Sequence, residues 1–138
     1  MFAGVITKTI LESTVIVAKL ATYNGKPAIY TGGLPDDAKY PAILIEEIGG
    51  EPWGCRERRG SEMTLEIKCF DSKEFTRKEI SDLARKIWDQ VDRSDLMPYI
   101  DDEGFENWGC TAHLPTFMDD GLNFPGYLIR VNLRVLYK

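Results

Sequence analysis

Two stretches of this chain alternate between apolar and polar residues, and this alternation restricts the fold more than any other feature. Over residues 62–69 the odd positions are apolar. The odd positions of residues 129–137 are apolar too, with Arg130, Asn132 and Arg134 between them. A period of two places every second side chain on the same face of a strand. We therefore expect two half-buried strands, each covering a core with one face.

The charged positions of these two strands also match in spacing. Glu62 and Glu66 are four residues apart, as are Arg130 and Arg134. If the two strands pair antiparallel, opposite charges lie across from one another, and each pair contributes a few tenths of a kcal/mol. The sequence leaves open whether the strands are neighbours or whether the charges are simply solvated.

Helical patterns occur at two places. Thr76 and Glu79 have the spacing of a capping box, which predicts a helix that starts there and runs to about residue 93. Its apolar stripe has helical spacing and consists of Ile80, Leu83, Ala84, Ile87 and Val91. Near the amino end, β-branched residues are frequent, but a second stripe still indicates a helix over residues 11–22, ended by Asn24 and Gly25. This stripe consists of Ile6, Ile10, Val17 and Leu20.

The remaining segments complete the expected order of elements. We expect strands over residues 26–31, 41–48 and 105–117, a loop over 32–39, a break at the glycines of 49–54, an acidic loop over 94–104 and a turn over 118–126. Runs of strands with few helices favour an α+β fold, an antiparallel or mixed β-sheet with two α-helices packed on one face. The 138 residues fit a single domain.

The composition of the chain argues against some classes of partner and of cellular location. The net charge of −5 makes tight nucleic-acid binding a poor prospect, because such binding needs clustered Lys and Arg. Three cysteines, an odd number, indicate a reducing compartment rather than a disulfide framework. No apolar run is long enough to span a membrane, and the first residues do not have the pattern of a secretory signal.

The residues that could carry chemistry are few. Cys55, Cys69, Cys110 and His113 could form a zinc site, but no Cys-x-x-Cys pair anchors it, and Cys69 lies in phase with core positions. A Cys110–His113 nucleophile pair lacks an accompanying oxyanion motif. We therefore expect no catalytic residues, metal or cofactor, and no enzymatic activity. A small metal-binding protein or enzyme that uses Cys110 and His113 remains the alternative.

Residues that could contact another protein are better candidates for a functional role than residues that could catalyse a reaction. Residues 53–60 combine Trp53 with Arg56, Arg58 and Arg59, and Trp and Arg are the residue types most often found as interface anchors. A flexible hairpin with solvated charges is an equally good interpretation of this segment. The loop after residue 31 contains no nucleophile or base, yet its sequence is particular, with Leu34, Pro35, Asp36 and Asp37 in succession.

Four features in order resemble a known family. They are the strand Ala28-Ile29-Tyr30, the segment 34–43 with its two prolines, Arg59-Gly60-Ser61 before the alternating strand, and the helix of residues 77–93. Together they cover about residues 15 to 93. They are similar to the small tail-completion, or head–tail joining, proteins of long-tailed bacteriophages and prophages, which include tail terminators.

The resemblance implies a structural virion protein. Its subunits would form a homo-oligomeric ring, hexameric in tail terminators, that caps the tail tube and joins it to the head. The implied partners are the major tail tube protein and the head connector or neck protein, with DNA passing through the ring without sequence-specific binding. The implied location is the virion tail or neck, after assembly in the host cytoplasm. We expect two segments to contact these neighbours, through Leu34, Pro35, Asp36, Asp37, Trp53, Arg56, Arg58 and Arg59.

Overall fold

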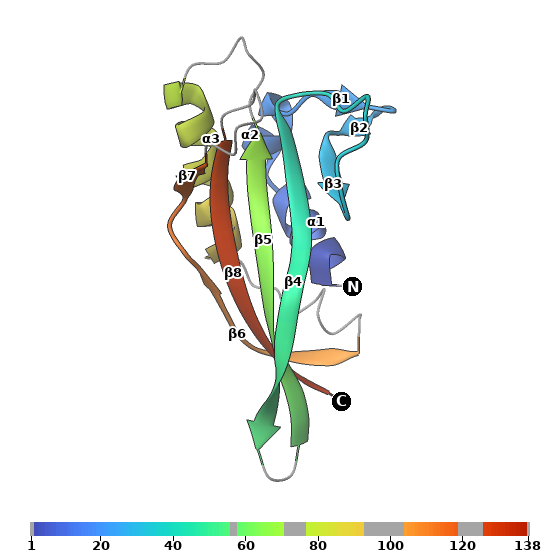
Figure 1. Cartoon of the computed structure of the whole chain (residues 1–138), viewed down its shortest axis with the longest axis vertical. Coiled ribbons are helices and arrows are strands. Elements are labelled where there is room, and N and C mark those ends of the chain that lie inside the picture. The colour runs from blue at the N-terminus through green and yellow to red at the C-terminus, as the bar shows by residue number, and fades with distance from the viewer. Residues whose placement is uncertain (1, 56–57, 71–76, 93–103, 119–125, 138) are drawn as a thin grey trace.

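A computed structural model gives the fold of the chain (Figure 1). It describes residues 2–55, 58–70, 77–92, 104–118 and 126–137, and at positions 55, 58, 77, 107 and 108 it describes the backbone alone. The elements in chain order are α1 (Phe2–Leu11), α2 (Thr14–Lys19), β1 (Thr22–Tyr23), β2 (Lys26–Pro27), β3 (Ile29–Thr31), β4 (Ala42–Cys55), β5 (Arg58–Phe70), α3 (Arg77–Asp92), β6 (Phe105–Ala112), β7 (Thr116–Met118) and β8 (Gly126–Tyr137).

One mixed sheet organises the described elements. Its strand order is β3-β4-β5-β8-β6, and β7 also pairs with β8. Strand β3 runs parallel to β4, and the other pairings are antiparallel. Strands β1 and β2 form a separate small hairpin. The predicted α+β class with a mixed sheet is confirmed, although the described part contains three helices rather than two.

The two alternating stretches are neighbours. Strand β5 pairs with β8 in a register that places Glu62 opposite Arg134 and Glu66 opposite Arg130. The first pair is an ion pair, with 3.2 Å between Arg134 Nε and Glu62 Oε2. The antiparallel pairing suggested by the charge spacing is therefore confirmed.

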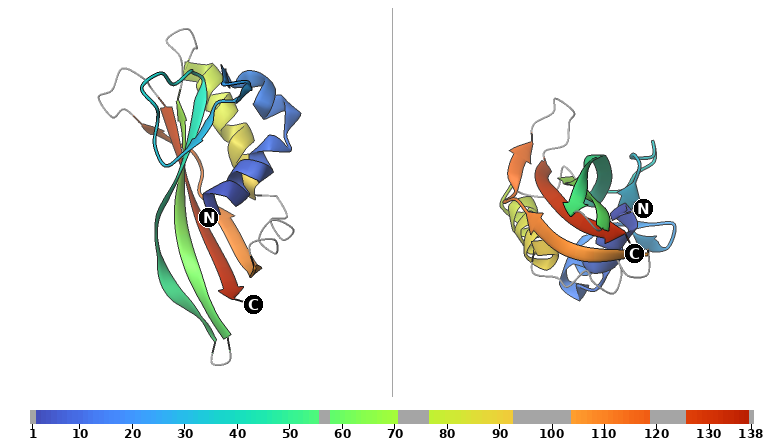
Figure 2. Two further views of the ribbon diagram at one scale, coloured as in Figure 1. Left: turned by 90° about the vertical axis from the view of Figure 1, so that its right-hand side faces the viewer. Right: turned by 90° about the horizontal axis from the view of Figure 1, so that it is seen from below.

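The main core lies between the sheet and the helices, which lie together on one side of it in Figure 2. The stripe predicted for α3 is buried, with Ile80 and Ile87 fully inaccessible. It packs with residues from α1 and α2 against alternate residues of the central strands, because side chains on one face of a strand recur every second position. These strand residues are Ile43, Ile45, Leu65, Ile67, Cys69, Ile129, Val131, Leu133 and Val135.

A second, smaller cluster covers part of the opposite face. Leu44 of β4 points away from the helices and packs with Tyr30 and Phe70. The segment between β3 and β4 closes over it through Leu34, Ala38 and Tyr40. The start of β4 is thus buried on both faces, which explains why its sequence is almost continuously apolar rather than alternating.

The helix predicted over residues 11–22 is wrong in its boundaries. Helix α1 starts at Phe2 and ends at Leu11, and a break in the helix at Glu12 and Ser13 separates it from α2. The break has a local cause, because Ser13 caps α2 by accepting a hydrogen bond from the amide of Ile16 at 3.3 Å. Ile16, which is off the predicted stripe, is buried in consequence.

Three strand predictions also need correction. The glycines of residues 49–54 do not end the strand, since β4 continues through them to Cys55. The strand predicted over 105–117 is divided into β6 and β7, and that of 26–31 into β2 and β3. Pro27 lies at the first division and Pro115 at the second, and proline cannot donate a hydrogen bond to a neighbouring strand. At the first division the partner also changes, since β2 pairs with β1 and β3 pairs with β4.

Candidate interaction surface

A bulge divides the β4–β5 pair into two parts. The register runs evenly from Ala42 to Glu47, then resumes with Gly49 opposite Thr64, so that Ile48 is the extra residue on β4. Beyond the bulge lie residues 49–55 and 58–64, which we call the arm. The far end of the arm extends past the helices (Figures 1 and 2).

The arm is broad at its base and narrow at its end. Strand β8 pairs with β5 as far as Gly60, and β6 pairs with β8 beside it. Past Gly60 only β4 and β5 remain paired. On its other side, β4 has no strand partner beyond Ile45 in the described part of the chain. A strand edge of this kind presents backbone donors and acceptors that suit another strand.

Gly60 is required where the arm leaves the sheet. It lies opposite Trp53 on β4 and Leu136 on β8. A Cβ atom at this position would lie 2.1 Å from the carbonyl oxygen of Val135 and 2.8 Å from Cδ2 of Leu136. Because of this close approach of the β8 backbone, any side chain at this position would force the structure to shift.

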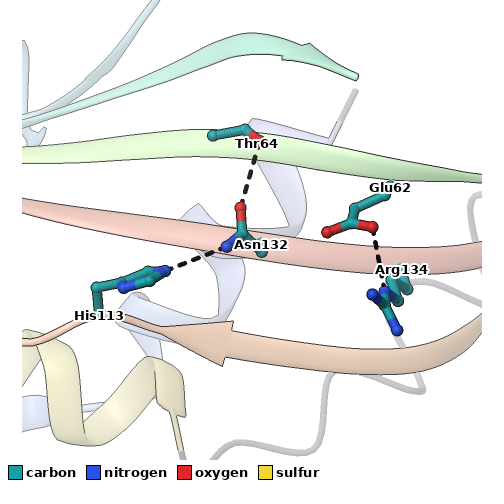
Figure 3. A network of polar contacts seen from close by, with 5 residues as sticks. All are labelled: Glu62, Thr64, His113, Asn132 and Arg134. Carbon is teal, nitrogen blue, oxygen red and sulfur yellow. Dashed lines mark hydrogen bonds and ion pairs between the residues drawn. The ribbon is translucent and has the colours of Figure 1, made fainter. Parts of the chain in front are cut away.

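Trp53, one of the predicted anchors, is held by a residue of its own chain. The guanidinium carbon of Arg134 lies 5.3 Å from the centre of the Trp53 ring, within range of a cation–π contact. Arg134 also forms the ion pair with Glu62 on the same face (Figure 3). Trp53 is half-buried, so part of its ring surface is accessible while the contact with Arg134 orients the ring.

The sheet face opposite the main core is polar along β5 and β8. Asn132 bridges His113 and Thr64, at 3.1 Å and 3.3 Å (Figure 3). Lys68 bonds Glu46 at 3.1 Å nearer the start of β4. The ion pairs Lys68–Glu46 and Arg134–Glu62 therefore neutralise part of the charge on this face, which also offers hydrogen-bonding groups.

The structure describes the three predicted arginines of the arm to different extents. Arg59 is exposed on β5, opposite Gly54. For Arg58 the backbone alone is described, as part of β5, and Arg56 lies outside the described residues. An open hollow along the arm is lined by Pro52, Trp53, Arg59 and Tyr137, among others.

The loop residues predicted as interface lie far from the end of the arm. The segment between β3 and β4 is at the opposite end of the molecule in Figure 1. Leu34 and Pro35 are half-buried, whereas Asp36 and Asp37 are exposed. Asp37 accepts a hydrogen bond from the Tyr23 hydroxyl at 2.9 Å, which fixes the loop against β1. Within the single chain, then, the two predicted contact segments are not brought together.

The cysteines and the histidine do not converge either. Cys110 packs against the main core, while His113 bonds Asn132 on the opposite face. Burial, and secondarily the charge of Asp92, raises the pKa of Cys110 to about 11, which keeps the thiol protonated at neutral pH. Cys69 is buried, and the Cys55 side chain lies outside the described residues. Among the described residues, no cluster of His, Cys, Asp or Glu could hold a metal ion.

Two features of the arm were not predicted from the sequence. Glu47 and Ile48 mark its base, and Ile48 is 53% exposed although it is a large apolar residue. The pair Gly49-Gly50 that follows is compatible with a strand end, but glycine within a strand also indicates a bulge. These two glycines are therefore the sequence signal from which the bulge could be predicted.

A comparison with known families places the chain. The model of the tail completion protein gp17 family matches residues 12–121. This chain therefore belongs to that family of structural phage tail proteins, which act in the virion. No match was found among curated proteins. None of the helices in the described residues is long and apolar enough to cross a membrane.

Proposed function

We propose that this chain is a ring-forming subunit that caps the tail tube and joins it to the phage head, as a tail terminator or a related neck protein. The observation that carries the proposal is the arm. It extends past the helices, keeps one strand edge unpaired by β-strands in the described chain, and presents Trp53 and Arg59 near its end. A tail-completion protein has to contact several neighbours, and the arm is a surface suited to such contacts.

Ring closure requires a heterologous interface, in which two different patches of one subunit meet. The end of the arm and the segment between β3 and β4 are two such patches. The first contributes the exposed Arg59 and the second the exposed Asp36 and Asp37. Opposite charge on the two patches favours contact between successive copies over contact between identical patches. We propose a hexamer, the state that the resemblance to tail terminators implies.

The other proposed partners follow from the position of such a ring. One side of the ring binds the major tail tube protein, and the other binds the head connector or neck protein. DNA passes through the channel without sequence-specific binding. The net charge of −5 agrees with this, because an acidic subunit does not retain the phosphate backbone. Assembly takes place in the host cytoplasm, and the ring then remains in the tail or neck of the virion.

Charge reversal at the end of the arm tests the proposal. We expect two losses in a variant with Arg56, Arg58 and Arg59 replaced by Glu. Ring formation, measured by light scattering, should decrease. When the variant is added to heads and to tails that lack the protein, the yield of joined particles should decrease to a similar extent. The matched control replaces Lys78, Arg85 and Lys86 by Glu, three exposed basic residues of α3. Unchanged assembly and joining in the arm variant would remove the arm from the function. A loss as large in the α3 variant would indicate a general effect of charge.

A further inference from the structure

The first turn of α1 is attached to the arm at its base. The backbone amide of Ala3 donates a hydrogen bond to Glu47 Oε1 at 3.1 Å, and that of Phe2 donates to the same oxygen. The first amides of a helix have no partner within the helix, so a carboxylate is a favourable acceptor for them. Glu47 is the last residue of β4 before the bulge. The helix thus holds β4 at the point where the arm begins.

A second attachment reaches the other strand of the arm. The Phe2 ring lies 5.1 Å from the Phe105 ring, which lies 5.4 Å from the Tyr137 ring. The Tyr137 hydroxyl is 2.6 Å from the hydroxyl of Ser61 on β5. These contacts form a continuous series from α1 through β6 and β8 to the arm. Phe2 is only 5% exposed, so its end of the series is anchored in the main core.

We propose that the first turn of α1 is a bracket that fixes the direction of the arm, so that the arm binds its partner as a preformed, rigid strand pair. A bulge makes a strand bend locally, and past Gly60 the arm is a pair of strands alone, which is only marginally stable in water. Without the bracket, β4 of the arm would be free to vary its angle at the bulge, and only the pairing of β5 with β8 would hold the base of the arm. With it, both strands of the arm are tied to the same helix turn. Glu47 and Tyr137 are therefore positioning residues rather than contact residues.

Rigidity matters for binding because ordering a flexible segment costs free energy when the complex forms. This consequence rests on the proposed function, in which the arm contacts a neighbour. The bracket itself concerns the free subunit and can be tested without any partner. Its failure would leave the ring proposal standing, and failure of the charge-reversal test would leave the bracket standing.

Hydrogen–deuterium exchange of the free protein provides the test. In Glu47→Ala we expect amides of the arm to exchange about five-fold faster, the size expected for losing one capping interaction. Amides of the body strands, residues 65–70 of β5 and 126–133 of β8, should keep their rates. Glu46→Ala is the matched control, because Glu46 is the preceding residue and bonds Lys68 instead of α1. Its arm amides should exchange as in the unmodified protein.

Two further variants complete the design. Glu47→Gln keeps a neutral acceptor and should give an intermediate rate, which also provides a result if Glu47→Ala does not fold. Tyr137→Phe keeps the ring contact but removes the hydroxyl, and should accelerate exchange mainly on the β5 side of the arm. Unchanged arm exchange in both Glu47 variants would overturn the proposal. So would acceleration of equal size in the body and the arm, since that would make Glu47 a residue of general stability.

Discussion

Single residues along the arm and at its base have roles that their chemical types make specific. Gly60 is selected by space, because β8 passes where a side chain would lie. Glu47 is selected by charge, because it accepts hydrogen bonds from the amino end of α1. Trp53 is oriented by Arg134, which Glu62 holds in turn. Each of these residues therefore responds to a different kind of substitution.

A methyl group at Gly60 should destabilise the protein. The added Cβ would lie 2.1 Å from a backbone oxygen, which cannot rotate away as a side chain can. We expect Gly60→Ala to lower the free energy of unfolding by about 1–3 kcal/mol, the usual cost of overpacking. Urea denaturation measures this change. Gly49→Ala is the control, because a Cβ there would meet nothing within 4 Å, and an equal loss in that variant would contradict the explanation.

The contribution of Glu47 should depend on pH. Partial burial by itself raises the pKa of Glu47. The hydrogen bonds and the positive charge at the amino end of α1 lower the pKa by more than burial raises it, so the pKa lies below its ordinary value of 4.5. A carboxyl whose folded pKa is lowered stabilises the fold above its unfolded pKa and loses this contribution as pH falls through the folded value. The difference in melting temperature between the unmodified protein and Glu47→Gln should be largest near pH 7 and shrink below pH 4.5. A difference that stays constant from pH 7 to pH 3 would exclude a role for the charge.

At the scale of helices and strands, some elements could be predicted from local sequence patterns, whereas others depend on tertiary contacts. Helix α3 and strands β5 and β8 were predictable, because the stripe ending at Val91 and the alternation around Leu65 are regular and face one core. The amino-terminal helix was predicted in the wrong place, because its β-branched residues give a weak pattern and the cap at Ser13 divides the segment into two helices. Strand β4 was predicted too short, because glycines within it fit a bulge as well as a turn.

The contribution of α3 can be measured at its buried stripe. Ile87 is fully buried between α3 and the sheet, so Ile87→Ala removes packed atoms and leaves a cavity. We expect a loss of about 2–5 kcal/mol in the free energy of unfolding. Val15→Ala on α2 is the control, since Val15 is 52% exposed and should cost less than about 0.5 kcal/mol. Equal losses at the two positions would show that α3 does not carry the main core.

The whole molecule combines a two-layer body with an arm. The helices cover the body, and the arm continues past them (Figure 2). The two segments predicted as interface belong to opposite ends of this shape, the end of the arm and the segment between β3 and β4 (Figure 1). That separation agrees with the proposed ring, in which each patch contacts a different neighbour. Residues near both ends, such as Arg59 and Asp36, are therefore candidates for contacts between copies rather than within one.

The sequence by itself determined the class of fold, the alternating faces of β5 and β8, the buried face of α3 and the family. These depend on periodicity and on local residue order, which a single chain displays directly. Only the tertiary structure decided that β4 continues past Gly50, that Glu47 holds α1 and that Gly60 lies against Val135. These features arise from contacts between residues far apart in the chain, and no periodicity encodes which distant atoms will meet.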